Sequence, residues 1–467
     1  MQSPSPVQVV SRRTVNPPPR PRERIPLTTW DLSLLSADYI QKGLLFAPPP
    51  FPTARLVDHL EASLADALAA YYPVAGRLAT DQHRDGGGCS VSVDCAGQGV
   101  EILQAVAAGV GIANVIPPDA DVPRVVRSFF PLDDAVNYDG HHRPLFAVQV
   151  TELADAVFLA FAYNHALSDG TAFWDFIAAW AETARAMLGR SAIRRALPPP
   201  VFVRWSPDGG AAAAAPVVLP YADLAGLIAR PTQPPPPQRE RMLHFTAESL
   251  EALKDRARQE LLAAGDAAGA AGVTKFQAMC SLLWRCFVSA RRVSPEQEVV
   301  FRASANNRAR LWPPLPAAYF GNAIGAVSTE PVRASELLAE RGHGWGAAAV
   351  GRAVAAHDDA GIRARAAAWA AEPGLSAFRL FDPNGMFVSS SPRFDMYGCD
   401  FGWGKPLAAR SGKANKYDGK VSLFPGREGG GSIDAEVVLA PEHMAAVELD
   451  DELWAAVSPD VLPAREG

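Results

Sequence analysis

The chain has 467 residues, of which 48% are hydrophobic and 20% are charged, an ordinary composition for a soluble globular protein. Its length predicts roughly two to three domains, with cores large enough to need no disulfide or structural metal. The 44 basic and 50 acidic residues give a net charge of -6, which excludes a global electrostatic attraction for nucleic acid or for an anionic membrane.

Cysteine usage and the termini indicate a cellular compartment. The five cysteines form an odd set without Cys-x-x-Cys spacing, which is typical of reduced thiols. The N-terminus has no apolar segment of signal-peptide length, and no run of about 18 apolar residues could span a membrane. The last residues match no retention or peroxisomal tail. We therefore expect a cytosolic monomer with no membrane partner, no nucleic-acid partner and no metal.

The first half is expected to contain both strands and helices. Leucines recur every four residues from Leu56 to Leu68, which predicts an amphipathic helix over residues 55–70. Pro73 then ends this helix. Strands are expected at residues 7–15, 39–46, 144–153 and 156–163.

The second half follows a stretch rich in proline and alanine. Residues 201–240 interrupt every periodic pattern and predict a crossover linker between an N-terminal domain, 1–200, and a C-terminal domain, 241–467. Thr246 is expected to cap one helix, and the segment from Thr274 is expected to start another. Strands are expected at 241–245, 299–305, 386–391, 420–424 and 432–439, and one long alanine-rich helix at 334–371. Both halves therefore predict an α/β fold with mixed sheets.

A candidate base lies between an apolar strand and a helix. His165, Asp169 and Gly170 follow the run at 156–163 and precede an aromatic helical segment. Gly170 favours a tight turn, in which His165 faces a cavity while Asp169 reaches into the protein and needs a buried cation. Spacing alone leaves two interpretations open, a catalytic pair and a structural pair. No Gly-x-Ser-x-Gly or His-Glu-x-x-His motif accompanies it.

A second constellation is the run Asp400-Phe401-Gly402-Trp403-Gly404. Two glycines around a tryptophan allow a sharp turn with close packing, and a preceding carboxylate can tie the loop through hydrogen bonds. By themselves these residues predict a structural loop.

The two motifs together resemble those of the plant BAHD acyl-CoA-dependent acyltransferases, and their order and separation also fit. Similar segments are Tyr71 to Leu78, Pro313 to Asn322, and Ser391 to Phe394, so the resemblance covers about residues 7–456. It implies two domains like chloramphenicol acetyltransferase, each a mixed sheet with helices, and an active-site channel at their interface. It also implies that acyl-CoA is the co-substrate and an alcohol or amine is the acceptor.

The resemblance further implies residue roles. His165 would be the general base of a direct transfer, with Asp169 held by Arg308 from the other domain. Asp400, Gly402, Trp403 and Gly404 would be structural supports, like Gly170. Two candidates for the oxyanion donor stay open, the Trp403 indole and a backbone N–H after His165.

Other contacts and functions also stay open. Lys275 is a candidate for the CoA phosphates, and Ser389, Ser390 and Ser391 for CoA or the acceptor, each against a solvated, structural alternative. Asn164 before the motif departs from peptide-synthetase condensation domains. The same fold could instead use His165 for intramolecular acyl capture or lyase chemistry, or bind a metabolite without catalysis. The acyl group and acceptor are not predicted.

Overall fold

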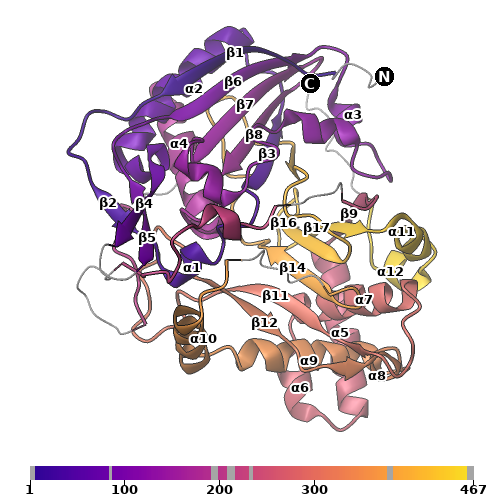
Figure 1. The fold of residues 1–467 in the computed structure, drawn as a ribbon. Coiled ribbons are helices and arrows are strands. Elements are labelled where there is room, and N and C mark those ends of the chain that lie inside the picture. The colour runs from indigo at the N-terminus through magenta and orange to yellow at the C-terminus, as the bar shows by residue number, and fades with distance from the viewer. Residues whose placement is uncertain are drawn as a thin grey trace.

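Two six-stranded mixed sheets organise the computed structural model, which describes residues 6–83, 87–190, 198–207, 216–230, 235–375 and 382–459. Figure 1 shows the first sheet in the upper part of the molecule and the second sheet in the lower part. The mixture of strands and helices in both halves confirms the predicted α/β class.

The first sheet has the strand order β1-β6-β7-β8-β3-β15. Only β6 and β7 run parallel, and the other neighbours are antiparallel. Its helices α2 and α4 pack against each other. The elements are β1 (Gln8–Val15), β3 (Ile40–Phe46), α2 (Thr53–Ala70), β6 (Val100–Ala107), β7 (Phe146–Leu153), β8 (Val157–Tyr163), α4 (Gly170–Met187) and β15 (Ala408–Ser411).

The second sheet has the strand order β12-β11-β14-β16-β17-β9, in which β11, β14 and β16 run parallel. Three helices, α5, α7 and α9, pack together beside it. The elements are β9 (Arg239–Phe245), α5 (Ala247–Ala263), α7 (Lys275–Ala290), β11 (Phe301–Asn306), β12 (Ile324–Ser328), α9 (Gly342–Ala355), β14 (Met386–Ser390), β16 (Lys420–Pro425) and β17 (Ile433–Leu439).

Shorter elements complete the chain, including a three-stranded sheet of order β2-β5-β4 and the pair β10-β13. The strands are β2 (Arg24–Pro26), β4 (Arg77–His83), β5 (Gly88–Asp94), β10 (Glu298–Val299) and β13 (Val332–Arg333). The helices are α1 (Thr29–Leu32), α3 (Ile112–Val115), α6 (Ala267–Gly272), α8 (Ala334–Leu337), α10 (Asp359–Ala371), α11 (Pro441–Val447) and α12 (Asp451–Trp454). The described residues also contain the 3-10 turns η1 (Tyr72–Ala75), η2 (Arg124–Phe129), η3 (Asn137–His141) and η4 (Ala225–Leu227). No helix in these described ranges is both long and apolar enough to cross a membrane.

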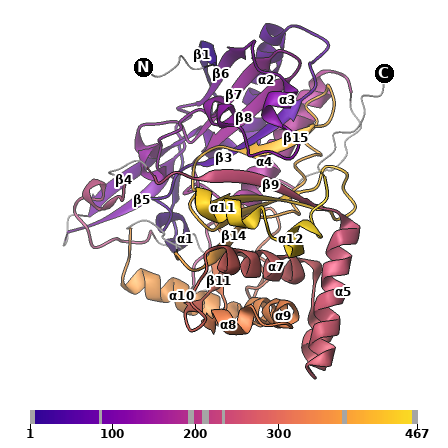
Figure 2. The ribbon, with the colours of Figure 1, turned by 90° about the vertical axis from the view of Figure 1, so that its right-hand side faces the viewer.

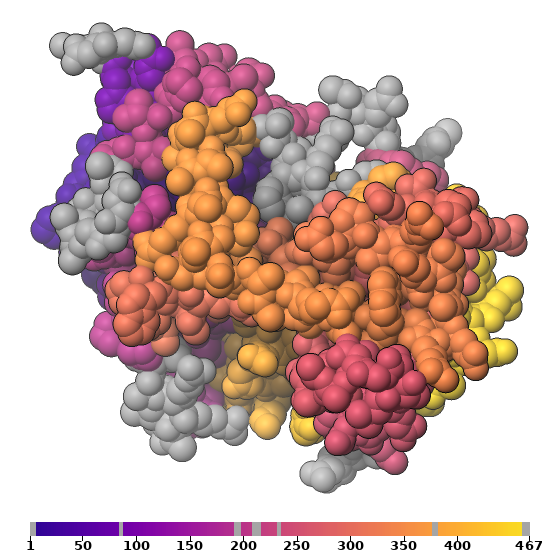
Figure 3. Space-filling model, turned by 90° about the horizontal axis from the view of Figure 1, so that it is seen from below, coloured from indigo at the N-terminus to yellow at the C-terminus, as the bar shows by residue number. Residues whose placement is uncertain are grey.

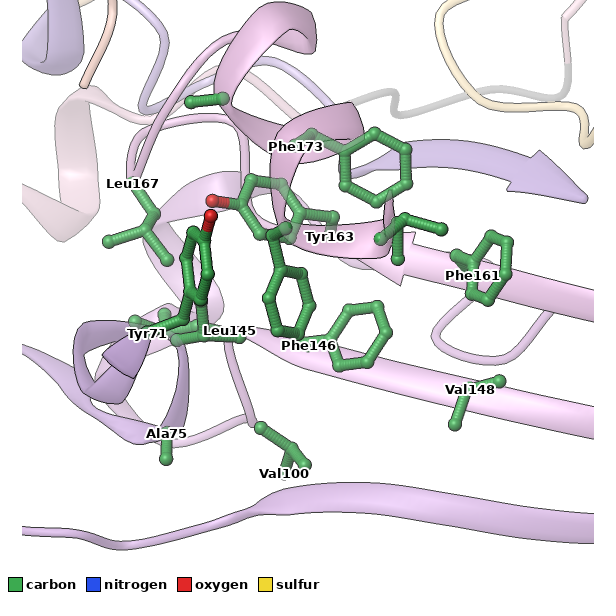
Figure 4. Close-up of a cluster of buried hydrophobic side chains, with 14 of the residues drawn as sticks. Tyr71, Ala75, Val100, Leu145, Phe146, Val148, Phe161, Tyr163, Leu167 and Phe173 are labelled. Carbon is green, nitrogen blue, oxygen red and sulfur yellow. The ribbon is translucent and has the colours of Figure 1, made fainter. Parts of the chain in front are cut away.

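An aromatic core fixes the strand that leads to the candidate base. Phe161 and Tyr163 of β8 lie beside Phe146 of β7 and Phe173 of α4, and all four side chains are fully buried (Figure 4). Burying an aromatic side chain stabilises a fold by about 1.5–3 kcal/mol, so this cluster holds the end of β8 rigidly. The residue after it is therefore presented from a firm support.

Segments of the second half reach across to the first. β15 pairs with β3 at the edge of the first sheet, and Phe401 and Phe424 are buried in the first core. Helix α10 contacts α1. Figure 3 shows orange residues of the second half extending over indigo and magenta residues of the first.

The linker predicted at 201–240 packs on both halves where the structure describes it. Val201 forms a bridge with Tyr319, and Leu219 forms one with Cys89. Strand β9, the edge strand of the second sheet on the side of the first sheet in Figure 2, begins inside the predicted linker. The parts of the linker at 208–215 and 231–234 lie outside the described residues.

The prediction of one long helix at 334–371 is wrong, because three helices occupy this region. α8 ends at Leu337, and α9 begins only at Gly342. The Asp358 side chain accepts a hydrogen bond from Gly361 N and begins a new helix, α10. A capping carboxylate satisfies a free N–H, which favours a helix start over continuation. Alanine periodicity carries no signal for such breaks.

Candidate active site

A tight turn joins β8 to α4 and carries the predicted motif. Tyr163 ends β8, and its hydroxyl hydrogen-bonds the Ser168 hydroxyl at 2.5 Å inside the turn. The Asn164 Oδ1 atom accepts a hydrogen bond from Ala166 N, 3.0 Å, and its Nδ2 donates to Asn137 O, 2.7 Å. Asn164 thus replaces backbone partners that the turn removes, which keeps the buried polar groups satisfied.

His165 lies where the two halves meet. Its backbone N donates to Asn137 Oδ1 of the first half at 2.7 Å. Its carbonyl oxygen accepts a hydrogen bond from Asn322 Nδ2 of the second half at 2.8 Å. The residue is half-buried, and its buried Nδ1 has no partner with hydrogen-bond geometry among the described residues. Both halves therefore fix the backbone of one histidine and leave its ring available.

The surroundings of His165 favour the neutral imidazole. Burial lowers its pKa below 6.5, and the positive charge of Lys420 adds to this effect. Its own backbone, the Asp169 carboxylate and the Asn322 side chain act in the opposite direction. A neutral imidazole has a free nitrogen lone pair, so His165 can accept a proton at neutral pH.

Asp169 begins helix α4 and points into the protein. Its Oδ1 accepts hydrogen bonds from the backbone N of Thr171 and Ala172, at 3.1 and 3.2 Å. Its Oδ2 accepts one from Ala323 N at 2.9 Å. Arg308 donates to both oxygens, Nη1 to Oδ2 at 2.7 Å and Nη2 to Oδ1 at 3.0 Å. The carboxylate is fully used in this network, and among the described residues it accepts no hydrogen bond from the His165 ring.

Gly170 lies against the second half. A Cβ atom at this position would come within 3.1 Å of the Phe394 ring. That separation is shorter than ordinary van der Waals contact, so a larger residue would push Phe394 and α4 apart. Gly170 therefore lets α4 begin directly beside the segment that follows β14.

Sequence reasoning assigned no site role to a second buried network beside the turn. Asn322 donates through its backbone N and Nδ2 to Asp31 Oδ1, at 3.2 and 2.9 Å. Arg204, from the predicted linker, donates to Leu167 O inside the turn at 2.9 Å. All three side chains are buried, and polar residues in apolar surroundings were the available signal. Asn137 is a further buried polar residue to which the sequence analysis assigned no role.

The loop at 400–404 is tied together by its carboxylate. Asp400 Oδ1 accepts hydrogen bonds from Gly402 N at 2.8 Å and Gly404 N at 3.0 Å. Both glycines have positive φ, +112° and +127°, which L side chains adopt only with strain. Arg190, after α4, donates to Gly402 O at 2.7 Å. The loop therefore packs against the far end of α4.

Trp403 is not available as an oxyanion donor, so that interpretation is wrong. Its ring packs 5.2 Å from Phe46, which pairs with Val157 at the start of β8. His165 follows the other end of β8, and six residues of strand span about 20 Å. The alternative donor next in sequence, Ala166 N, already donates to Asn164 Oδ1. Long-range placement decides the first case, and a local side-chain hydrogen bond decides the second.

The candidate substrate contacts come from two separate elements, α7 for Lys275 and the end of β14 for the three serines. Lys275 begins α7, where its Nζ lies 3.0 Å from Glu251 Oε2. Ser389 and Ser390 end β14, and Ser390 has a positive φ of +63° with a buried, unpartnered hydroxyl among the described residues. The Ser391 hydroxyl accepts from Arg393 N at 3.2 Å. Among the described residues, none of these four side chains forms a hydrogen bond or ion pair with His165.

No cluster of three or more histidine, cysteine, aspartate or glutamate side chains with metal-ligand geometry occurs in the described part of the chain. All five cysteines are free and buried. Burial raises the pKa of Cys280, Cys286 and Cys399, so these thiols stay protonated at neutral pH.

Comparison with known proteins places this geometry in a family. The profile of the Transferase family matches residues 5–454, nearly the whole chain. The BAHD acyltransferase DCR of Arabidopsis thaliana is 33% identical over 94% of this chain and 90% of its own length. The chain belongs to the BAHD acyltransferase family. A BAHD acyltransferase transfers acyl groups from CoA thioesters, so the protein is an acyl-CoA-dependent acyltransferase.

Solved structures show the same fold. Vinorine synthase gives a TM-score of 0.70 at 20% identity and covers 97% of this chain and 98% of its own. TRI101 of F. sporotrichioides, solved with coenzyme A and T-2, gives 0.69 at 18% identity over 94% of this chain and 100% of its own. The expected pair of domains like chloramphenicol acetyltransferase is thereby confirmed for this BAHD acyltransferase.

Proposed function

We propose that His165 is the general base that transfers an acyl group from acyl-CoA to a hydroxyl or amine acceptor of plant specialised metabolism. The observation that carries the proposal is the half-buried imidazole at the meeting of the two halves, fixed through its backbone by Asn137 and Asn322. A lowered pKa keeps it neutral. A positioned base of this kind contributes roughly a hundred- to ten-thousandfold to the rate.

The proposed reaction needs no acyl-enzyme. His165 takes the proton of the acceptor O–H or N–H, and the acceptor oxygen or nitrogen attacks the thioester carbonyl carbon. The carbon–sulfur bond then breaks, and the CoA thiolate recovers the proton from the imidazolium. Holding both substrates together replaces a bimolecular encounter, which further lowers the barrier.

The remaining roles are proposed with it. The two substrates reach His165 along a channel between two domains, 1–200 and 241–467. The segment 201–240 connects these domains. Lys275 meets the CoA phosphates, and Ser389, Ser390 and Ser391 meet CoA or the acceptor. Asp169, Gly170 and Arg308 hold the turn, while Asp400, Gly402, Trp403 and Gly404 hold the far end of α4. The TRI101 structure with coenzyme A supports the donor, since it has the same fold.

The test replaces His165 by alanine. We expect transfer to be abolished while melting temperature and CoA binding stay at wild-type values, because the side chain makes no hydrogen bond that the turn requires. The control is His83→Ala, an exposed histidine of β4 outside the site. Retained turnover in the His165 variant would sink the general-base role. A panel of acetyl-, malonyl-, benzoyl- and hydroxycinnamoyl-CoA against pooled alcohols and amines supplies the assay.

A further inference from the structure

One face of the second sheet, on β14 and β16, looks toward the first half. In β16, Val421 and Leu423 point into the second core, whereas Phe424 belongs to the first. Because side chains alternate along a strand, Lys420 and Ser422 share the side of Phe424. This face therefore lies at the border between the two sheets in the middle of Figure 1.

Lys420 is a buried lysine without a charged or hydrogen-bonding partner in the part of the chain that the structure describes. The residue is 8% exposed. Its Nζ lies 4.1 Å from the centre of the Phe387 ring and 5.4 Å from that of Tyr417. Burial, with the charge of Lys42 adding to it, lowers the pKa of Lys420 to about 7. A buried ammonium without an anion is costly, so this arrangement is incomplete as it stands.

Two hydroxyl groups lie on the same face. Phe387 pairs with Lys420, and Ser389 pairs with Ser422, across β14 and β16. The register places both serines next to the position of the lysine. Neither serine hydroxyl has a hydrogen-bond partner among the described residues. One ammonium group and two free hydroxyl groups are the donors that a carboxylate accepts from.

A second lysine increases the positive charge of this face. Lys42 of β3 places its Nζ 4.2 Å from the centre of the Phe424 ring. Glu436, which pairs with Ser422 across β16 and β17, is an acid on this face, but its oxygens are already bound by Lys416, 2.9 Å from Oε1, and by the Ser411 hydroxyl. Burial lowers the pKa of Lys42 to about 8, against the opposing effect of Glu436. The face therefore keeps an excess of positive charge.

The end of β14 leads to the turn that carries His165, because Ser390 is followed by the segment whose Phe394 ring would lie 3.1 Å from a Cβ atom at Gly170. The charge of Lys420 also contributes to the lowered pKa of His165. We propose that Lys420, with Ser389, Ser422 and Lys42, binds a carboxylate group carried by one of the two substrates, so that the enzyme selects an acidic acceptor or an acidic acyl group. The proposal rests on the proposed function. It makes Lys420 a specificity-determining residue.

The test compares ligands that differ in one carboxylate. The acceptor arm uses p-coumaric acid and its methyl ester, and the donor arm uses malonyl-CoA and acetyl-CoA. Affinities are measured by calorimetry at mildly acidic pH on the His165→Ala enzyme, in which the proposed transfer cannot proceed. We expect Lys420→Met to weaken the acidic ligand of one arm by about 10- to 100-fold, as loss of a charged hydrogen bond implies. The uncharged partner should bind unchanged.

Two further variants keep the result interpretable. Lys420→Arg should retain most of the preference, and Lys254→Met, at a partly exposed position of α5, should change neither ligand. If Lys420→Met does not fold, Lys420→Gln takes its place. The proposal is overturned if the enzyme with Lys420 intact binds the acidic ligand no more tightly than its uncharged partner in either arm. It is also overturned if Lys420→Met weakens the binding of the acidic ligand and of the uncharged partner equally. An intact preference together with no acyl transfer by the wild-type enzyme would instead overturn the proposed function.

Discussion

Arg308 binds both carboxylate oxygens of Asp169, although the two residues lie 139 positions apart in the chain. The contact joins the start of α4 in the first half to the end of β11 in the second. Three backbone N–H groups also donate to the same carboxylate. Asp169 therefore stabilises the turn that presents His165 and does not act as the hydrogen-bond partner of its ring.

Replacing Asp169 by asparagine should reduce stability and activity together. The substitution leaves the Arg308 guanidinium buried without its counter-ion, and breaking such a pair costs about 3–5 kcal/mol. Chemical denaturation and steady-state kinetics on the same sample check this.

The control for Asp169 is Asp58→Asn. Asp58 is paired with Arg13 at the surface, where its side chain is 64% exposed. Exposed pairs contribute about 0–1 kcal/mol, so this variant should behave as wild type. Lost activity in Asp169→Asn at an unchanged melting temperature and unchanged substrate affinity would count against the structural role.

The pH profile should show the lowered pKa of His165. A base works only when it is unprotonated, so kcat/KM should be constant at neutral pH and fall as pH drops through a value below 6.5. Because the charge of Lys420 contributes to the lowering, Lys420→Met should move this acid limb to higher pH. An acid limb above 6.5 in the wild type, or one that does not move in the variant, would contradict the electrostatic account.

Gly402 should tolerate no side chain. Its φ of +112° strains any L residue, so Gly402→Ala should cost about 1–3 kcal/mol of stability. Gly374→Ala is the matched control, because its backbone avoids positive φ and a Cβ there would meet no atom within 4 Å. Thermal melting compares the two. At low temperature the folded Gly402 variant should keep wild-type kcat, and a selective loss of kcat would show that the loop acts on the chemistry.

Lys275 and Lys254 offer a pair for testing the proposed CoA contact. Both ammonium groups bind the exposed Glu251 on α5, but only Lys275 lies at the start of α7. Lys275→Met should raise KM for acyl-CoA roughly tenfold, about 1.4 kcal/mol, with kcat unchanged. Lys254→Met should leave KM alone. Equal KM values in the two variants would remove Lys275 from the site.

Local patterns predicted the elements well where one physical effect dominates. The leucines from Leu56 to Leu68 predicted α2, Thr246 caps α5 as expected, and the helix expected from Thr274 is α7. These signals depend on hydrophobic periodicity and on one capping hydroxyl, both of which are local. The three helices in place of one at 334–371 show the limit, because alanine is compatible with both arrangements.

The site was less predictable because distant segments complete it. The strand, turn and helix around His165 follow from adjacent residues, and Arg308 came from the family resemblance. Asn137 and Asn322 reach His165 only after folding. Trp403 is separated from His165 by the length of β8, and the packing of the two sheets brings the side of β16 that carries Lys420 to the border with the first half. The spacing of residues along the sequence does not reveal where Trp403 and Lys420 lie relative to the site.

Strand β15 makes the two halves inseparable as polypeptides. β15 covers the open edge of β3, where Leu407 N donates to Leu45 O. In the sequence, β15 lies almost 370 residues after β3. A fragment that stopped after the first half would expose this edge and lose Phe401 and Phe424 from its core. Uncovered edges pair with other chains, so such a fragment would aggregate. Protein engineering that recombines halves from two relatives must therefore exchange β15 together with the first half.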